Sequence, residues 1–473
     1  MVFSSLPFQF FFLPLFFLVY FAAKKRKTRN MVLLGFSMFF YAWGEPIYVL
    51  LMMFSIANNY VFGYFIAKNS ENKKRAKYLL IASVAVNLFV LGLFKYTDFI
   101  IGNLRLIPGL SWMEPLGLAL PIGISFYTFQ TMSYTIEVYK KETNMQKNIA
   151  TFGAYVAGFP QLIAGPIVRY RDIAEELDER IETTDEFAEG LRRFTAGLAK
   201  KILIANTMAE ACDNIMAKYS GGFADSIGAL GMWLAILAYT LQIYYDFSGY
   251  SDMAIGLGRM MGFHYLENFN YPYISKSVTE FWRRWHMSLS SVFRDFVYIP
   301  LGGNRVKTPR WIFNMLVVWF LTGLWHGAQW TFILWGAYFG ALLIFEKLVL
   351  KDVLQKFPVI GHIYTITAFV FGWIIFRAES LPHIGTILSA MFGASGAGSA
   401  LGLAENGMLK PMYLVVMAVG IICSVPVSKK IKAILEKNKK TAYIIDAASV
   451  VAVILCIMML AQGAYNPFIY FRF

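Results

Sequence analysis

The sequence predicts an all-α protein that crosses a membrane many times, and three observations predict this fold class. Hydrophobic residues make up 58% of the 473 residues and charged residues only 15%, against about 25% in average soluble domains. Apolar runs of helical length alternate with short polar segments. Basic residues concentrate in those polar segments, as they do in cytoplasmic loops. These observations exclude a soluble multidomain protein, a disordered chain, collagen and a coiled coil.

The positive charge does not indicate a nucleic-acid-binding protein. Lys and Arg number 43 against 29 Asp and Glu, a net charge of +14. A nucleic-acid interface needs basic residues gathered on one surface among stacking aromatic residues, whereas these are spread over the loops. The three cysteines, Cys212, Cys423 and Cys456, have neither zinc-site nor disulfide-framework spacing. We therefore expect no nucleic-acid partner and no metal ion.

The first apolar run, residues 7–23, is predicted to be a retained helix with an extracytoplasmic N-terminus. It lacks the basic start of a signal peptide, and five basic residues follow it in 24–30. Segment 68–77 is also basic and is predicted to face the cytoplasm, as is 139–148. Segment 95–115 has no net charge and is predicted to face outside. The first predicted spans cover 7–23, 31–43, 46–67, 78–94 and 116–138.

Residues 167–193 form the only long charged stretch, with both signs of charge at helical spacing. They predict a cytosolic or interfacial helix pair. Segment 428–440 carries six lysines against Glu436, so it is predicted to face the cytoplasm and the tail 462–473 to lie outside. The remaining predicted spans are 149–166, 227–245, 328–345, 363–376, 411–427 and 441–461. The prediction is therefore about eleven crossings, with further re-entrant or interfacial helices, in one domain over 1–473.

Residues 311–345 contain no formal charge. As one helix they would span about 52 Å, well beyond a hydrocarbon core of about 30 Å. Gly323 and Gly327 flank Trp325 and His326, so we predict a helix break there, which is tolerated at membrane depth where protein or a wet cavity satisfies the backbone. His326 would then line a cavity as a neutral general base. The alternative is a structural histidine bonded to a nearby carbonyl.

The preceding segment, 276–310, has seven basic residues against two acidic ones. It is predicted to be amphipathic and interfacial, and to bind the phosphates of an anionic donor. The alternative is anchoring to the membrane surface by Trp and Arg. The candidate donor-binding residues are Trp282, Arg283, Arg284, Trp285, Arg294, Asn304 and Arg305.

Asp246 and Asp252 lie in apolar surroundings at 242–256. They could form a proton path. Hydrogen bonds that join helices, to Ser248, Ser251 or Arg259, are the favoured alternative.

Several motifs together carry a resemblance that covers essentially the whole chain. They are the opening MVFSS, FPQLIAGPIVRY at 159–170, QIYYDFSGYSDMAIG at 242–256, WRRWHMSLSSVFRDFVYIPLGGNR at 282–305 and LTGLWHGAQW at 321–330. The sequence resembles the membrane-bound O-acyltransferase family, in particular its bacterial alginate O-acetyltransferase branch. The resemblance implies a multi-helix fold around a central tunnel that an acyl donor enters from the cytoplasm. It also implies that His326 is the catalytic histidine and that His286 is a second functional residue.

The chain ends in PFIYFRF at 467–473. This motif resembles the terminal motif of the same branch and, in its FIY core, that of a small membrane protein of the teichoic acid D-alanylation system. The resemblance implies that Tyr470 carries the acyl group. The alternative is an aromatic residue that anchors the last helix at the membrane surface.

The resulting hypothesis is an O-acyltransferase of the bacterial cytoplasmic membrane, with acetyl-CoA as donor substrate and no bound cofactor. His326 would deprotonate an acceptor hydroxyl, and His286 would be one candidate donor to the oxyanion. An extracytoplasmic partner of the serine-hydrolase type would pass the acetyl group to a polysaccharide. The alternatives are a teichoic acid D-alanyl transferase that uses a carrier protein, and a transporter of a glycan or ion. The transporter hypothesis is weakened because the sequence shows one broken helix and no repeat.

Overall fold

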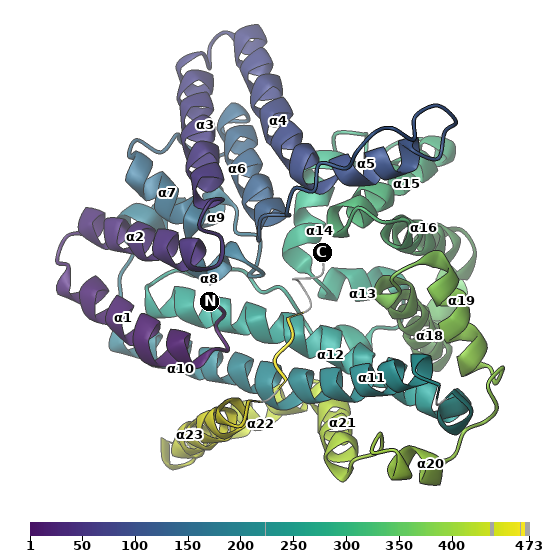
Figure 1. Ribbon diagram of the computed structural model, residues 1–473. Helices are drawn as coiled ribbons and strands as arrows, with labels where there is room; N and C mark the ends of the chain where they lie inside the picture. The colour runs from purple at the N-terminus through teal and green to yellow at the C-terminus, as the bar shows by residue number, and fades with distance from the viewer. Residues whose placement is uncertain (223, 436–438, 464, 469–473) are drawn as a thin grey trace. The chain divides into compact units, whose positions relative to one another are not determined.

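The computed structural model describes residues 1–222, 224–435, 439–463 and 465–468, and helices are the regular secondary structure within these ranges (Figure 1). Backbone contacts divide the chain into two compact units. Unit 1 comprises Met1–Phe194 and Ser251–Glu267, and unit 2 comprises Thr195–Tyr250 and Asn268–Phe473. The single domain expected from the sequence stays a prediction.

Within the described ranges, six helical segments are long and apolar enough to cross a membrane. These segments confirm a helical, multi-pass membrane protein, whereas the count of eleven crossings stays a prediction. They are Val49–Lys68, Lys73–Lys95, Ala224–Met260, Trp330–Lys356, Pro358–Arg377 and Tyr443–Ala461.

Unit 1 begins with an aromatic helix pair. A π-helical turn η1 (Phe8–Phe12) continues into α1 (Leu13–Ala22), and α1 packs against α2 (Arg26–Gly44). The rings of Phe8, Phe12 and Phe16 surround Phe159 at centroid distances of 6.1, 5.3 and 5.0 Å. Phe159 begins α8 (Phe159–Leu162), which follows α7 (Ile149–Ala157). The aromatic rings of the first apolar run therefore pack against Phe159, in the segment that follows α7.

The helices α3 (Val49–Lys68), α4 (Lys73–Lys95) and α6 (Ile124–Tyr139) pack side by side (Figure 1), and α5 (Thr97–Leu104) follows α4. Their shared interior is polar. Asn59 Nδ2 lies 3.0 Å from Asn87 Oδ1, and the hydroxyls of Thr131 and Ser83 donate to the same pair of amides at 3.3 Å. Such bonds between helices hold bundles together where apolar burial gives little preference.

The charged stretch 167–193 contains two helices, as predicted, namely α9 (Tyr170–Glu179) and the start of α10 (Thr184–Ala199). Between them, Glu182 accepts from Tyr20 at 2.8 Å and from Arg29 at 2.6 Å, and it pairs with Arg26. Burial alone would raise the pKa of Glu182, but these hydrogen bonds and charges hold it at about 2. Segment 24–30, predicted to face the cytoplasm, therefore contacts segment 167–193, predicted to be cytosolic or interfacial.

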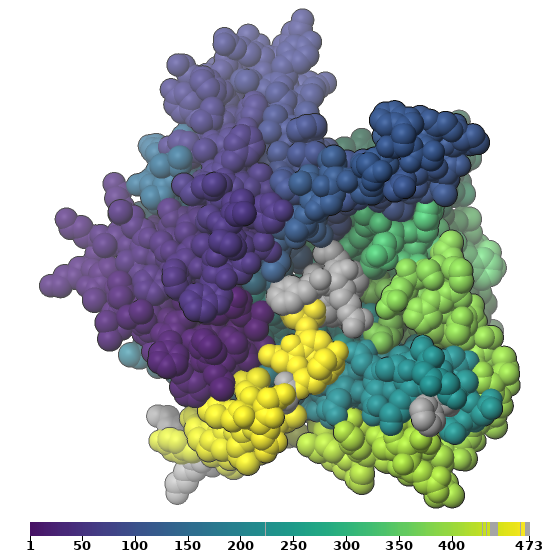
Figure 2. Space-filling view, viewed as in Figure 1, coloured from purple at the N-terminus to yellow at the C-terminus, as the bar shows by residue number. Residues whose placement is uncertain are grey.

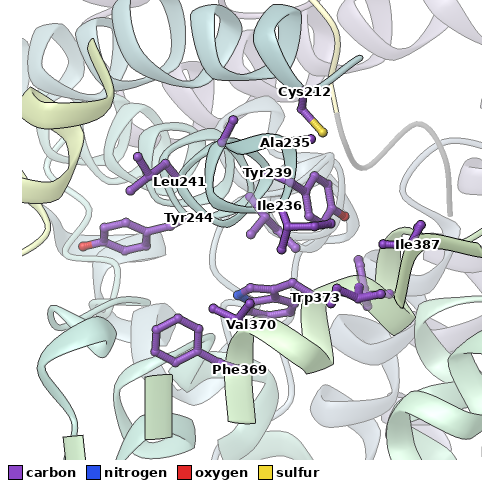
Figure 3. Packing of buried hydrophobic residues seen from close by; sticks show 14 of the residues in the cluster. Cys212, Ala235, Ile236, Tyr239, Leu241, Tyr244, Phe369, Val370, Trp373 and Ile387 are labelled. Atoms are coloured by element: carbon purple, nitrogen blue, oxygen red, sulfur yellow. The ribbon is translucent and has the colours of Figure 1, made fainter. Parts of the chain in front are cut away.

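Unit 2 is built around α12 (Ala224–Met260), whose residues up to Tyr250 belong to this unit. Figure 3 shows Ile236 and Tyr239 of α12 lying opposite Val370 and Trp373, which belong to α18 (Pro358–Arg377). Buried side chains of α12, α13, α16 and α18 form one continuous hydrophobic core. The other helices around it are η2 (Lys200–Ala205), α11 (Asn206–Ser220), η3 (Pro272–Ile274), α13 (Val278–Arg284), α14 (Met287–Phe293), η4 (Arg294–Tyr298), α15 (Thr308–His326), α16 (Trp330–Phe345), η5 (Glu346–Leu350) and α17 (Lys351–Lys356).

The remainder of unit 2 is α19 (Leu381–Met391), α20 (Ala400–Glu405), α21 (Pro411–Cys423), α22 (Val427–Leu435) and α23 (Lys439–Ala461). The last described residues, which follow α23, contact η2 and α11 of the same unit. The Lys201 ammonium donates to the Pro467 carbonyl, and Asn206 Nδ2 donates to Asn466 Oδ1 at 3.1 Å. Figure 2 shows the C-terminal part of the described chain (yellow) beside the teal surface of α11.

Candidate active site

The charge-free stretch 311–345 is broken, as its length required. Helix α15 ends at His326, Gly327 is extended (φ −173°, ψ 156°), and α16 begins at Trp330. The break lies slightly later than predicted, because Gly323 is still helical and its carbonyl accepts from the Gly327 N–H at 3.3 Å. His326 is therefore the last residue of a helix.

Gly323 has a packing role instead. Helices α15 and α16 pack against each other, and a Cβ added at Gly323 would meet the backbone carbonyl of Phe332. A Cβ at Gly336 would in turn lie 3.3 Å from the Gly323 Cα and against the Trp319 carbonyl. The two glycines allow the backbones of α15 and α16 to approach closely.

His326 is buried among aromatic rings. Its imidazole centroid lies 5.1 Å from Trp325, 4.9 Å from Trp335 and 5.1 Å from Phe376, each in an edge-on geometry. Only 7% of His326 is exposed. Trp335 comes from α16 and Phe376 from α18, so three helices build this enclosure.

His286 lies close by. Its ring packs edge-on against Phe247 at 4.6 Å and lies 5.8 Å from Trp325. Because Trp325 lies 5.1 Å from His326, the two imidazole centroids are no more than about 11 Å apart. The structure thus brings together the two histidines that the sequence singled out, through Trp325.

His286 is held in an unusual backbone conformation. It joins α13 to α14 with φ 45° and ψ 53°, the left-handed region. Its Nδ1 lies 3.2 Å from Asn268 Oδ1. Burial lowers the pKa of His286 to about 3, so the ring is neutral at physiological pH.

The candidate donor-binding residues divide into two groups. Trp285 is a buried core residue that packs on Trp373 at 4.8 Å, and the partly buried Trp282 packs against the core on Trp319 and Phe339 at 4.9 Å each. The others lie at or near the surface. Arg284 pairs with Glu280 at 2.8 Å and Arg294 with Asp295 at 2.6 Å. The exposed side chains of this group are those of Arg283, Arg294, Asn304 and Arg305.

The two aspartates join helices through ion pairs. Asp246 Oδ1 lies 2.7 Å from Lys201 Nζ, with both side chains buried, and Asp252 Oδ1 lies 2.6 Å from an Arg193 nitrogen. A helix-joining role was favoured from the sequence, but with other partners. Arg259 instead pairs with Glu186 and Glu189.

Tyr470, the proposed acyl carrier, lies outside the described residues, as do Glu436 and Lys437 of segment 428–440. The described residues just before it are anchored in unit 2. The Phe468 ring lies 5.0 Å from Tyr250, and the Tyr465 hydroxyl donates to Asp213 at 2.8 Å. In the described ranges no cluster of His, Cys, Asp or Glu could hold a metal ion.

Comparison with known proteins decides the family. The model of the membrane-bound O-acyltransferase family matches residues 38–383, which is more than half of the chain and includes both histidines. The chain belongs to this family. This acyltransferase is 46% identical to the probable alginate O-acetylase AlgI of Pseudomonas aeruginosa, over 83% of this chain and 75% of the relative. It is 34% identical to the peptidoglycan O-acetyltransferase of Helicobacter pylori, over 84% and 80%.

The teichoic acid D-alanyltransferase of Bacillus subtilis is a more distant relative, 30% identical over 55% of this chain and 70% of the relative. The family match and the two O-acetylating relatives show that the chain is a membrane-embedded O-acyltransferase. Family membership favours this activity over the transporter that the sequence left open.

Sequence reasoning missed several residues of this acyltransferase that shape the histidine environment. Asn268 and Phe247 contact His286, and Trp335 and Phe376 contact His326. Asn268 lies 18 positions before His286. No local spacing rule links such residues, because the fold alone brings them together.

Proposed function

We propose that this acyltransferase moves an acetyl group from cytoplasmic acetyl-CoA across the bacterial cytoplasmic membrane, for O-acetylation of an extracellular or cell-wall polysaccharide. The relatives support an O-acetyl transfer to a polysaccharide, since one is named for alginate and another for peptidoglycan. A central tunnel would bring the donor, made inside, to an acceptor outside.

One observation carries the proposal. His326 stands at the end of a helix, buried among three aromatic rings, one of which, Trp325, also contacts a second buried imidazole. An enclosure that excludes water suits an acyl transfer, because water would otherwise hydrolyse the thioester. A side chain with an ordinary pKa near neutrality is suited to general base catalysis there.

The reaction balances with His326 as the proton carrier. Its imidazole takes the proton of the acceptor hydroxyl while that oxygen attacks the thioester carbonyl carbon. The tetrahedral intermediate then collapses, the carbon–sulfur bond breaks, and the CoA thiolate receives the proton. The products are an acetyl ester and free CoA.

The experiment replaces His326 by Ala and, as a closer match in shape, by Gln. Acetyl transfer from labelled acetyl-CoA, measured in membranes, should fall about 10²- to 10⁴-fold with unchanged protein abundance. His383→Gln is the matched control, because His383 lies on α19 outside the aromatic enclosure. Activity that survives in both His326 variants would refute the general-base assignment.

The first acceptor in this proposal is Tyr470, from which a serine-hydrolase-type partner outside the membrane takes the acetyl group. The described residues Asn466 and Pro467, a few positions before Tyr470, are hydrogen-bonded to Asn206 and Lys201 of unit 2. Intact-mass measurement of the C-terminal peptide should detect an acetyl adduct that is absent in Tyr470→Phe. An adduct that persists in this variant would rule out the relay.

The second candidate function is D-alanyl transfer from a carrier protein, favoured by the likeness to the Bacillus subtilis enzyme. Segment 276–310 would then bind an acidic carrier protein instead of CoA phosphates. A donor-swap assay separates the two functions: acetyl-CoA alone should suffice for the first, and only the loaded carrier for the second.

A further inference from the structure

The backbone of His286 needs an explanation. Only three non-glycine residues in the described part of the chain have positive φ, namely Lys141, Tyr271 and His286. Side chains other than Gly, Asn and Asp adopt this region at an energetic cost, and such residues concentrate at functional sites. The position therefore retains an imidazole where glycine would fit the turn better.

Asn268 fixes the orientation of that imidazole. Its Oδ1 accepts from the Ser288 N–H at 3.2 Å and from the Ser288 hydroxyl at 2.9 Å, and lies 3.2 Å from His286 Nδ1. Its backbone carbonyl accepts from the Met287 N–H at 3.0 Å. Asn268 is fully buried. The asparagine is thus bonded to the backbone of the two residues that follow the strained residue.

These contacts determine the tautomer of His286. A backbone N–H can only donate, so the Asn268 atom that faces Ser288 must be its oxygen. The Ser288 hydroxyl lies 3.4 Å from His286 Nδ1 but donates to the Asn268 oxygen at the shorter distance of 2.9 Å. His286 Nδ1, which faces the same oxygen at 3.2 Å, then carries a hydrogen of its own. In a neutral imidazole this leaves the lone pair on Nε2.

The Nε2 atom of His286 is buried and has no hydrogen-bond partner among the described residues. Buried polar atoms are nearly always bonded in folded proteins, and an exception points to a ligand or a catalytic role. The atom belongs to a ring beside Trp325, the side chain that also touches His326. An acceptor is therefore held ready within the proposed active site.

We propose that Asn268 is a positioning residue that fixes His286 as the Nδ1–H tautomer, so that Nε2 accepts a hydrogen bond from a polar hydrogen of the bound substrate. That hydrogen is an N–H or O–H of the donor's pantetheine arm, because the hydrogen of the reacting acceptor hydroxyl goes to His326. For His286 this replaces the oxyanion-donor role considered from the sequence, since a neutral Nε2 with a lone pair cannot donate. The inference rests on the proposed acetyl transfer for its kinetic readouts only.

The tautomer can be measured on resting protein. The chain has only five histidines, so ¹⁵N-histidine labelling with solid-state NMR in lipid gives a simple spectrum, and His286→Gln identifies the signal. We expect a protonated Nδ1 and a bare Nε2 in wild type, and loss of this state in Asn268→Leu. A protonated Nε2 in wild type, or an unchanged tautomer in Asn268→Leu, would overturn the inference whatever the enzyme's substrate.

The kinetic arm compares two substitutions. Asn268→Leu removes the acceptor and should lower kcat/KM about tenfold or more. Asn268→Asp keeps the acceptor but adds a negative charge, which favours imidazolium and raises the pKa of His286. Because the protonated ring cannot accept at Nε2, the acidic limb of the pH profile should move up by about one unit or more, and the loss of activity above this limb should be smaller than in Asn268→Leu.

The split between parameters assigns the hydrogen. A raised KM for acetyl-CoA in Asn268→Leu supports a group on the pantetheine arm, and a lowered kcat with unchanged KM for acetyl-CoA contradicts it. The control is Asn314→Asp, another buried asparagine of unit 2, whose amide donates to Leu301 and Gly303 and which should leave the acidic limb unmoved. Equal losses in both Asn268 variants without a pH shift would reduce Asn268 to a structural role.

Discussion

The Glu182 carboxylate binds three side chains from two neighbouring helices. Tyr20 comes from α1, and Arg26 and Arg29 come from α2. Their hydrogen bonds and charges outweigh the effect of burial and hold the pKa of Glu182 at about 2, below its ordinary value of 4.5. A group whose pKa is lower in the folded than in the unfolded state stabilises the fold above the unfolded pKa.

At the residue scale this predicts a pH-dependent effect. Glu182→Gln should lower the unfolding temperature in detergent at pH 7 by several degrees, because a neutral amide cannot hold the arginines as strongly. The difference from wild type should shrink as the pH falls from about 4.5 towards 2, as the native carboxylate also loses its charge. Glu71→Gln is the control, since Glu71 is 95% exposed in its pair with Lys141. A difference that stays constant with pH would contradict the ionic explanation.

Helices η2 and α12 are joined by a buried ion pair, Lys201 with Asp246, whose side chains are 3% and 1% exposed. Removal of one partner leaves an unpaired buried charge and costs about 3–5 kcal/mol, whereas replacement of both by apolar residues is often neutral. Helix η2 is a π-helical turn between α10 and α11, a distortion frequent at functional sites.

At the element scale we predict that Lys201→Met and Asp246→Leu each destabilise the protein strongly, and that the double variant is more stable than either. Thermal unfolding of the purified protein in detergent measures all three. Additive losses would mean that the two side chains act independently. Because Lys201 also holds the Pro467 carbonyl, Lys201→Met should in addition speed maleimide labelling of Phe468→Cys in the tail.

The sequence predicted the helices better than their ends. The predicted spans 46–67 and 363–376 correspond to α3 and α18, because a long apolar run in a membrane protein is compatible with little other than a helix. The run 31–43 was too short, because α2 starts at Arg26, within the basic cluster, where arginine is a good helix former. The run 149–166 is split at Gly158, whose φ −44° and ψ 109° are not helical, just before Pro160.

The site was predictable in part. The helix break beside His326 was predicted because a charge-free run of 35 residues could not be one helix, and His286 was singled out by the resemblance of its motif. Its partner Asn268 could not be found, because the contact depends on the left-handed turn at His286. The packing of Trp282 and Trp285 on the core was also missed, since tryptophan beside arginine is equally typical of a membrane surface.

At the scale of the whole molecule, the charge pattern predicts which loops face the cytoplasm. The contact of Arg26 and Arg29 with Glu182 agrees with a location of segments 24–30 and 167–193 on the same side of the membrane. We predict that Asn72→Cys, in a background without Cys212, Cys423 and Cys456, reacts with a membrane-impermeant maleimide in inverted vesicles only. Leu106→Cys, in the exposed segment 105–107, should react in intact spheroplasts only. The opposite labelling of either position would invert the predicted topology.

The end of α15 at His326 has an electrical consequence. The last carbonyls of a helix carry a partial negative charge, and the extended Gly327 prevents α15 from continuing past them. A proton that His326 takes from an acceptor hydroxyl would create a cation at this negative end. Such an arrangement stabilises an imidazolium by about 0.3–1 kcal/mol, and by up to about 2 kcal/mol where the site is partly buried. The break that ends α15 thus also favours the charged form of His326 that the proposed reaction requires.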